Sequence, residues 1–141
     1  MRVCGVDLTA NDAVICLLFE ESRQFTLANC RVRKLSLPKN HTLEDLRQFQ
    51  FAFAKLMGDY KVNRVAIRER MTKGKFAGGA VSFKLEAAIQ LIDNIDVVVL
   101  PPTLIKTMLK ENPLAISFDD TDLKEFQKAA FTVAYASHMI K

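Results

Sequence analysis

The sequence lacks the features that would anchor the protein in a membrane or export it. No apolar run approaches the roughly 20 residues needed to cross a bilayer. The chain enters strand-like residues directly after Met1, without the basic and then apolar segment of a secretory leader. Internal repeats and low-complexity segments are absent too. These absences predict a cytoplasmic protein with no membrane partner.

Cysteine is scarce, and the excess of one charge is small. The only three cysteines, Cys4, Cys16 and Cys30, lie in apolar sequence without the close cysteine or histidine spacing of a zinc site. We expect reduced thiols in the core. The net charge of +4 permits binding to a polyanion but does not require it. His41 and His138 have no evident partner, so neither is assigned a role.

What the chain does contain is apolar residues, which make up 50% of it and recur with the periods of strands and helices. A chain of 141 residues with this composition suits one globular domain, residues 1–141, that buries about 68% of its unfolded surface. The patterns predict strands at residues 3–6, 13–19, 24–37, 62–67 and 97–100. They predict helices at residues 43–60, 81–92, 104–109 and 120–140.

The connections between these elements predict their arrangement. Tight turns join the first three strands, which should therefore pair in antiparallel hairpins. Each later strand is reached through a helix and should pair in parallel by a right-handed crossover. We expect an α/β fold with a five-stranded mixed sheet in the order 3-2-1-4-5 and helices on both faces.

Asp7 ends the first strand, and this strand is predicted to lie in the middle of the sheet. Residues 3–6 form a short, unbroken apolar run, which is typical of a strand buried on both faces. A carboxylate at the carboxyl end of a central strand lies on the edge where open α/β sheets bind ligands. Asp7 is thus either a local turn acceptor or the first member of an active site.

The order of elements resembles the ribonuclease H-like fold, and three short motifs resemble its RuvC-type resolvase branch. These are Gly5-Val6-Asp7, a carboxylate at the end of the fourth strand, and Pro102-Thr103-Leu104-Ile105-Lys106 after the fifth. The resemblance covers almost the whole chain and suggests an uncharacterised bacterial family of this type. Such nucleases hold Mg²⁺ or Mn²⁺ with acids from the first and fourth strands and the last helix. Two such cations roughly 3.5–4 Å apart need several oxygen ligands.

The resemblance implies Asp7 and Glu69 as catalytic acids and metal ligands. Asp7 aligns directly, whereas the family's second acid falls on Arg68, one residue before Glu69. A slip of one residue turns a side chain to the other face of the sheet, unless a bulge at Arg68 restores it. A solvated ion pair of Glu69 with Arg68 and Arg70 is the alternative to metal binding.

On the last helix, the family's two acids fall on Phe126 and Ala129, which cannot bind a metal. Asp122 and Glu125 stand one turn earlier with the same separation of three residues, and on a helix they would share a face. They are the remaining candidates for metal ligands. The alternative is structural, because acids in a first turn offset the helix dipole and these two have the spacing of a capping box.

Basic residues near the predicted site suggest contacts with nucleic acid. Arg68, Arg70, Lys73 and Lys75 follow the fourth strand, and the last two belong to a glycine-rich loop that precedes a helix. Such a loop can hold a phosphate, although it lacks the Gly-Lys-Ser/Thr ending of a P-loop, and a mobile surface loop is the alternative. By resemblance, Lys106 is a catalytic lysine near the scissile phosphate; otherwise it is a solvated helix residue.

Two function classes follow. The first is a Mg²⁺- or Mn²⁺-dependent nuclease or resolvase, and the second is a catalytically inactive module that binds nucleic acid or a protein through the same surface. Because Phe126 and Ala129 replace the family's acids, we expect metal-dependent cleavage to be weak or absent. The opening Gly-Val-Asp-Leu-Thr also resembles the phosphate hairpin of actin-like ATPases and sugar kinases. Those enzymes build their site between two such domains, and this chain contains one.

Three aromatic residues predict a second subunit. Phe51 lies opposite the core stripe of its helix, and Phe131 and Tyr135 form a pair four residues apart, away from the core stripe of the last helix. Large aromatic side chains outside a core stripe indicate a further surface that is covered by either another helix or a second subunit. We therefore expect a homodimer.

Overall fold

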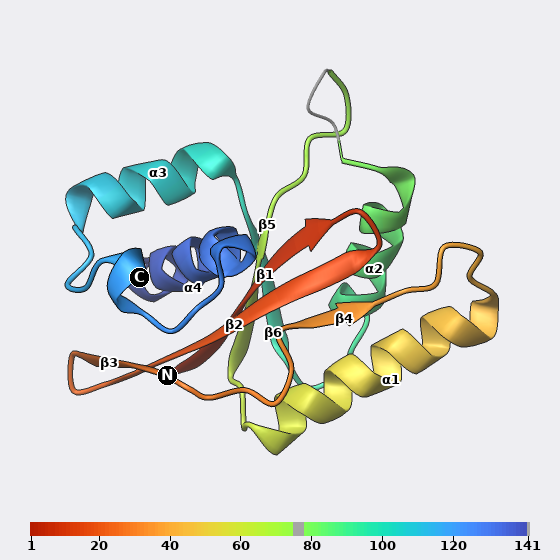
Figure 1. Ribbon diagram of the computed structural model, residues 1–141, viewed down its shortest axis with the longest axis horizontal. Coiled ribbons are helices and arrows are strands. Elements are labelled where there is room, and N and C mark those ends of the chain that lie inside the picture. Colours follow the sequence, from red (N-terminus) through yellow and green to blue (C-terminus); the bar gives the residue numbers. More distant parts are fainter. Residues whose placement is uncertain (75–77, 141) are drawn as a thin grey trace.

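The computed structural model describes residues 1–74 and 78–140. Figure 1 shows a twisted mixed sheet with helices packed on both faces. The strands are β1 (Arg2–Thr9), β2 (Asp12–Glu21), β3 (Gln24–Leu27), β4 (Lys34–Ser36), β5 (Arg64–Arg68) and β6 (Asp96–Leu100). The helices are α1 (Leu43–Asp59), α2 (Ala80–Gln90), α3 (Pro102–Glu111) and α4 (Lys128–Met139), with short 3₁₀ turns η1 (Phe118–Asp120) and η2 (Glu125–Gln127) before α4.

Strand β1 lies in the middle of the sheet, as predicted. The strand order is β3-β2-β1-β5-β6; β1 pairs antiparallel with β2 and parallel with β5. The side chains of Val3, Cys4 and Val6 are 0% exposed. This confirms the predicted fold class and the predicted order of hairpins and crossovers. A strand without polar side chains is most stable where both of its faces are covered.

The predicted third strand is divided in two. Both β3 and β4 pair with β2, so the described sheet has six strands rather than five. Between them the chain leaves β2, and the Ile15 carbonyl instead accepts a hydrogen bond of 3.0 Å from the side-chain amide of Gln127. Gln127 is only 5% exposed. It therefore satisfies a buried backbone group that a continuous strand would have paired.

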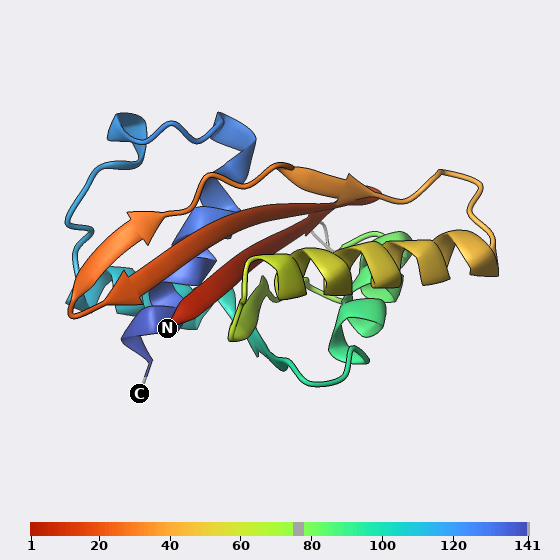
Figure 2. The same cartoon turned by 90° about the horizontal axis from the view of Figure 1, so that it is seen from below.

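The two faces of the sheet carry separate cores. Figure 2 shows α1 and α2 on one face and α4 on the other. Alternate residues of β1 divide between them: Cys4, Val6 and Leu8 pack with α1 and α2, whereas Val3 packs with α3 and α4. Among the helices that the structure describes, none combines the length and apolar character needed to cross a membrane.

The cysteines lie where their apolar surroundings predict. All three are free thiols; Cys4 and Cys16 are buried, and Cys30 is half-buried. Burial raises the pKa of the Cys16 thiol to about 12, with a further contribution from nearby Cys30. The Cys16 thiol therefore stays protonated at neutral pH and behaves as a small apolar group.

The last helix is shorter than predicted. Residues 120–140 were expected to be helical, but α4 begins at Lys128, and Thr121 and Lys124 have extended backbone angles. The Lys124 N–H donates to the side chain of Gln127 at 3.0 Å, and Thr121 donates to the Phe118 carbonyl at 2.6 Å. These local bonds compete with a continuous helix across this segment.

Two of the three aromatic residues expected at a subunit interface are core residues instead. Phe131 is 2% exposed and Tyr135 is 6% exposed. Phe131 packs against Phe118, with ring centroids 5.9 Å apart, and the Tyr135 hydroxyl donates to the Pro113 carbonyl at 3.2 Å. The segment between α3 and α4 therefore covers the surface that was assigned to a second subunit.

Gly5 sets how closely α4 approaches the sheet. A Cβ atom at this position would overlap the Ala130 carbonyl oxygen and lie 2.8 Å from the Ala134 Cβ and 2.9 Å from the Ala134 nitrogen. Contacts below 3.0 Å with backbone atoms require the helix to move. The helix backbone therefore lies directly on β1, with alanines at the contact.

We expect Gly5→Ala to destabilise the protein by about 3 kcal/mol or more, because the added methyl group meets backbone that cannot rotate away. Urea denaturation followed by circular dichroism measures this loss. Gly58→Ala is the matched control, since a Cβ at Gly58 would have no atom within 4 Å. That control should be neutral or gain about 0.5–1 kcal/mol. Equal stability of wild type and Gly5→Ala would contradict the close packing.

Candidate functional site

Asp7 lies beside the last residue of β5, near the carboxyl end of β1, which continues to Thr9 rather than ending at Asp7 as predicted. The parallel register pairs Val6 with Ile67, so Asp7 follows next to Arg68. Because strand side chains alternate between faces, Asp7 and Arg68 are on the α4 face, together with Val3 and Ala66. The carboxylate is therefore at the sheet edge where the sequence predicted a site.

Glu69 is on the opposite face. Its neighbour Ile67 packs with the α1 and α2 core, and the Glu69 N–H continues the sheet by donating to the Leu100 carbonyl at 2.9 Å. Glu69 lies close enough to Glu86 of α2 to help raise the pKa of that carboxyl group, after the larger effect of burial. No bulge restores its direction, so the structure does not bring Glu69 to Asp7. The residue next to Asp7 is Arg68.

A second arginine also faces Asp7. Arg70 Nη1 lies 3.8 Å from Asp7 Oδ1, and the two side chains are 21% and 15% exposed. This distance is within ion-pair range but too long for a hydrogen bond. Arg70 Nε is buried without a hydrogen-bond partner among the described residues. The buried Nε is not accessible, so only the exposed part of the Arg70 side chain remains open to a ligand.

Gly78 leaves room for the Arg70 side chain, a role that sequence reasoning missed. A Cβ at Gly78 would lie 2.9 Å from Arg70 Cβ and 3.1 Å from Arg70 Nε. The Gly78 N–H also donates to the Met71 carbonyl at 2.8 Å. The available signal was the Gly78-Gly79 pair directly before a helix, because consecutive glycines mark a close approach of backbone to another group.

The electrostatic surroundings of Asp7 are mixed. Burial raises the pKa of Asp7 above its ordinary value, and the neighbouring guanidinium groups of Arg70 and then Arg68 lower it in part. The free-energy cost of removing the carboxylate from water is thus larger than the stabilisation that the two arginines provide. A partly buried acid of this kind is frequent at functional sites.

The residues around Asp7 do not fit a site for two divalent cations. Within residues 1–74 and 78–140, no group of three or more histidine, cysteine, aspartate or glutamate side chains can hold a metal ion. Mg²⁺ and Mn²⁺ need several oxygen ligands, whereas Asp7 has two guanidinium groups beside it. The predicted set of Asp7, Glu69, Asp122 and Glu125 is therefore not assembled as a metal centre.

Asp122 and Glu125 precede α4 and do not share a helical face. Asp122 is exposed and lines a hollow of about 370 Å³, together with Asn29 and Arg33 of the β3–β4 connection. Glu125 is exposed at the start of η2. Neither forms an ion pair with a described residue. The absence of a helical turn at residues 121–124 removes the geometry on which their pairing depended.

The predicted basic residues are spread over three elements. Arg68 ends β5, and Lys73 is exposed in the segment that follows Arg70. Lys75 lies outside the described residues. Lys106 is exposed on α3 and forms no ion pair with any residue that the structure describes. The arrangement thus joins Asp7, Arg68 and Arg70 into one cluster, with Lys73 nearby in sequence.

We expect Asp7→Asn to stabilise the protein at pH 7, by the roughly 0.5–2 kcal/mol typical of a favourable single substitution, because it removes a buried charge. The raised pKa means that the wild type gains stability from a bound proton below the unfolded value of about 3.9. That gain is lost as pH rises through the higher native pKa. The stability of Asp7→Asn relative to wild type should therefore increase as the pH rises from the unfolded pKa to the native pKa of Asp7, and it should stay constant above the native pKa.

Thermal unfolding between pH 3 and 8 measures the difference. Asp12→Asn is the control, because Asp12 forms a partly exposed ion pair with Lys34 at 3.6 Å and its loss should cost no more than about 1 kcal/mol. If Asp7→Asn were less stable than wild type at pH 7, the attraction of the two arginines for the carboxylate would exceed the cost of burying its charge.

The comparisons with known proteins agree with this fold. The structure is similar to RuvC of Thermus thermophilus, with a TM-score of 0.76, 10% identity, and 99% of this chain and 94% of that chain covered. It is also similar to T. thermophilus RuvC in complex with Holliday junction substrate, with a TM-score of 0.73, 12% identity, and 99% and 93% covered. For the Fowlpox virus resolvase with substrate Holliday junction DNA, the TM-score is 0.55 at 14% identity, and both chains are covered to 100%.

At these identities the likeness establishes a shared fold, which confirms the predicted ribonuclease H-like architecture of the RuvC type. No curated protein matches the sequence significantly. The model of one family, described as "Protein of unknown function (DUF3010)", matches residues 1–137. The chain therefore belongs to the DUF3010 family.

Proposed function

We propose that the protein binds nucleic acid phosphates at the carboxyl edge of β1 and β5 and does not cleave them through divalent metals. The observation that carries this proposal is Arg68, which occupies the strand position next to Asp7 on the α4 face. A metal-dependent site needs an oxygen ligand there. A guanidinium group instead offers charge and paired N–H donors that match a phosphate.

Arg70 supports the same function. Its guanidinium group is only loosely held by Asp7 at 3.8 Å, and its buried Nε has no partner among the described residues. Asp7 therefore orients Arg70 without using all of its donors. An incoming phosphate oxygen then replaces water at the exposed part of the Arg70 side chain, and Lys73 extends the positive charge along the same segment.

Branched DNA is the ligand class to test first, because two of the similar structures are complexes with Holliday junction DNA. Their likeness in fold makes the corresponding sheet edge of this chain a reasonable docking surface. Phosphate contacts alone do not read sequence, so we expect binding that depends on shape and salt rather than on base order.

Metal-dependent cleavage is the second candidate, and Asp7 favours it. A partly buried carboxylate with a raised pKa at the end of the central strand is costly to keep for structure alone. This candidate needs further oxygen ligands from outside the cluster described above.

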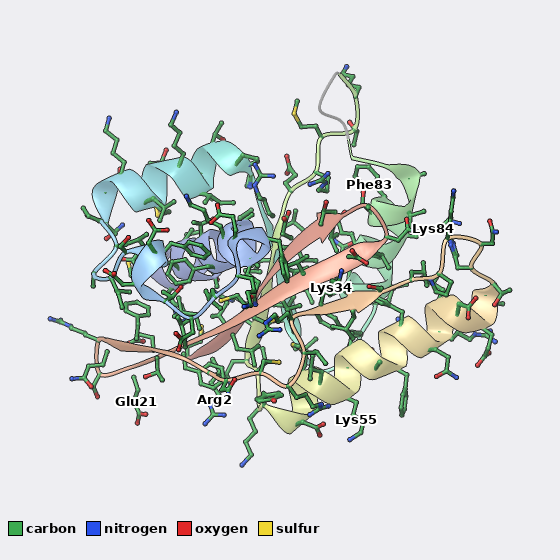
Figure 3. All side chains as sticks on the ribbon, viewed as in Figure 1. Arg2, Glu21, Lys34, Lys55, Phe83 and Lys84 are labelled. Carbon is green, nitrogen blue, oxygen red and sulfur yellow. The ribbon has the colours of Figure 1, made fainter. Side chains whose placement is uncertain are left out.

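For binding, we expect Arg68→Ala and Arg70→Ala each to weaken the affinity for a four-way DNA junction about 10-fold, since each removes a charged hydrogen-bond donor. Each should also reduce the slope of log affinity against log salt by about one. Fluorescence anisotropy at several salt concentrations measures both quantities. Lys55→Ala is the control, because it changes the net charge by the same amount. Lys55 lies near the carboxyl end of α1 (Figure 3). If Lys55→Ala bound the junction as weakly as the arginine variants do, the loss of affinity would be an effect of net charge and not of these two side chains.

For cleavage, we expect no metal-dependent product from junction, duplex or RNA–DNA hybrid substrates, and no rise in melting temperature with Mn²⁺. The reason is that, among the described residues, no three or more histidine, cysteine, aspartate or glutamate side chains form a group that could hold a metal ion. Gel assays with Mg²⁺ and Mn²⁺, using wild type and Asp7→Asn, measure this directly. Robust cleavage that is lost in Asp7→Asn would overturn the binding proposal in favour of a nuclease.

A further inference from the structure

The outer edge of β2 has a gap between its two partner strands. β3 and β4 pair with opposite ends of β2 and leave residues 15–17 between them (Figure 1). The N–H and C=O groups on such an edge need partners from elsewhere. Ile15 has both, because its N–H donates to the Arg33 carbonyl at 2.9 Å and its carbonyl accepts from Gln127 at 3.0 Å.

Leu17, on the same edge, has a partner for only one of its two backbone groups. Its carbonyl accepts from the Ala28 N–H at 3.1 Å, so both groups point away from β1, because the N–H and C=O of one strand residue lie on the same side. Pairing with β3 begins only at the next residue, and the Leu17 N–H has no hydrogen-bond partner among the described residues. Leu17 is 2% exposed. A buried N–H without a partner is rare and indicates that another group binds there.

Leu17 lines a hollow of about 370 Å³ at this gap, between the β3–β4 connection and the segment before α4. Gln127 lines it too and is only 5% exposed. Its side-chain amide has two N–H groups, of which one makes the bond to β2 described above and the other is unused among the described residues. The half-buried side chains of Leu27, Val32 and Leu123 add an apolar lining. Small-molecule sites have this size and this combination of apolar lining with a few polar groups.

Two charged side chains of opposite sign also line the hollow. Arg33 comes from the β3–β4 connection and Asp122 from the segment before α4. Both are exposed, and neither side chain takes part in an ion pair between described residues. The neighbouring Arg31 differs, because its guanidinium group donates to Asp59 at 2.8 Å. Arg33 and Asp122 can therefore bind a ligand that carries both charges.

We propose that this hollow binds a free amino acid with an apolar side chain. Such a molecule carries a carboxylate and an ammonium group on the same carbon atom. The carboxylate accepts from the Leu17 N–H and from the Arg33 guanidinium group, and the ammonium group pairs with Asp122. The apolar side chain lies against Val32 and Leu123.

The mixture of charges distinguishes this ligand from others. A phosphate would be repelled by Asp122, and nucleic acid would require an excess of bases. A fatty acid would leave the Asp122 carboxylate without a partner. The end of a peptide has an amide where a free amino acid has its ammonium group. The site is also separate from the phosphate-binding edge that we propose, because the hollow is on the outer edge of β2 and Asp7 is beside β5, across β1.

An NMR titration of the isotope-labelled protein with L-leucine tests the proposal. We expect the signals of the Leu17 backbone amide and the Gln127 side-chain amide to shift and saturate. The dissociation constant should be about 1 mM or tighter for a ligand of this size. Arg33→Ala and Asp122→Asn should each raise this constant about 10-fold, because each removes a charged hydrogen-bond partner.

Two analogues separate the contributions of the ligand's charges. L-leucinamide lacks the carboxylate, and N-acetyl-L-leucine lacks the ammonium group and resembles the end of a peptide. Each should bind about 10-fold more weakly than L-leucine. Binding of N-acetyl-L-leucine as tight as that of L-leucine would assign the hollow to a peptide terminus and overturn the proposal. Equal binding of L-leucinamide would overturn it as well.

Arg31→Ala and Asp119→Asn are the matched controls, because they make the same changes of charge at residues that do not line the hollow. Both should keep the wild-type dissociation constant, and the NMR spectra should show that all four variants are folded. Wild type that shows no saturable shift up to about 10 mM L-leucine would overturn the proposal. Arg33→Ala and Asp122→Asn proteins that bind as tightly as wild type, or controls that bind as weakly as these variants, would also overturn it.

Discussion

The contact between Gly5 of β1 and the backbone of α4 is the constraint on which much of the structure depends. Because Gly5 has no side chain, the Ala130 and Ala134 region of α4 lies directly on the central strand. This contact covers the face of β1 that also carries Asp7, two residues further along. Asp7 is itself partly buried, and this burial raises its pKa.

The chemistry of the site depends on a single position along β5. Alternation along the strand places Arg68 on the same face as Asp7 and sends Glu69 to the side of α2. The sheet edge therefore combines one carboxylate with two guanidinium groups. Such a cluster stabilises itself partly without a cation, and it exposes donors rather than acceptors to a ligand. The fold is shared with RuvC of Thermus thermophilus, and the charges at this edge are the basis of the phosphate binding that we propose.

The two faces of the sheet differ in what they leave exposed. The α4 face buries a polar cluster at its edge, while the α1 and α2 face is covered by helices whose outer sides remain apolar around Phe51.

The sequence by itself determined the elements whose signals are local. The unbroken apolar run of β1, the short turns of the hairpins and the helix between β1–β3 and β5 were sufficient for the sheet order, because pairing rules leave few alternatives. The position of Asp7 at the end of β1 followed in the same way. The short alternation of Arg68, Glu69 and Arg70 also contained the information that these side chains divide between two faces.

Only the tertiary structure decided what depends on distant contacts. The side-chain amide of Gln127 donates to the Ile15 carbonyl, a contact between residues that are far apart in the chain. Phe131 and Tyr135 are core residues because the segment between α3 and α4 covers them, and no helical period includes that segment. The approach of Arg70 to Asp7 depends on Gly78, eight residues later in the chain. A local pattern cannot report such contacts, because the partners meet only when the whole chain has folded.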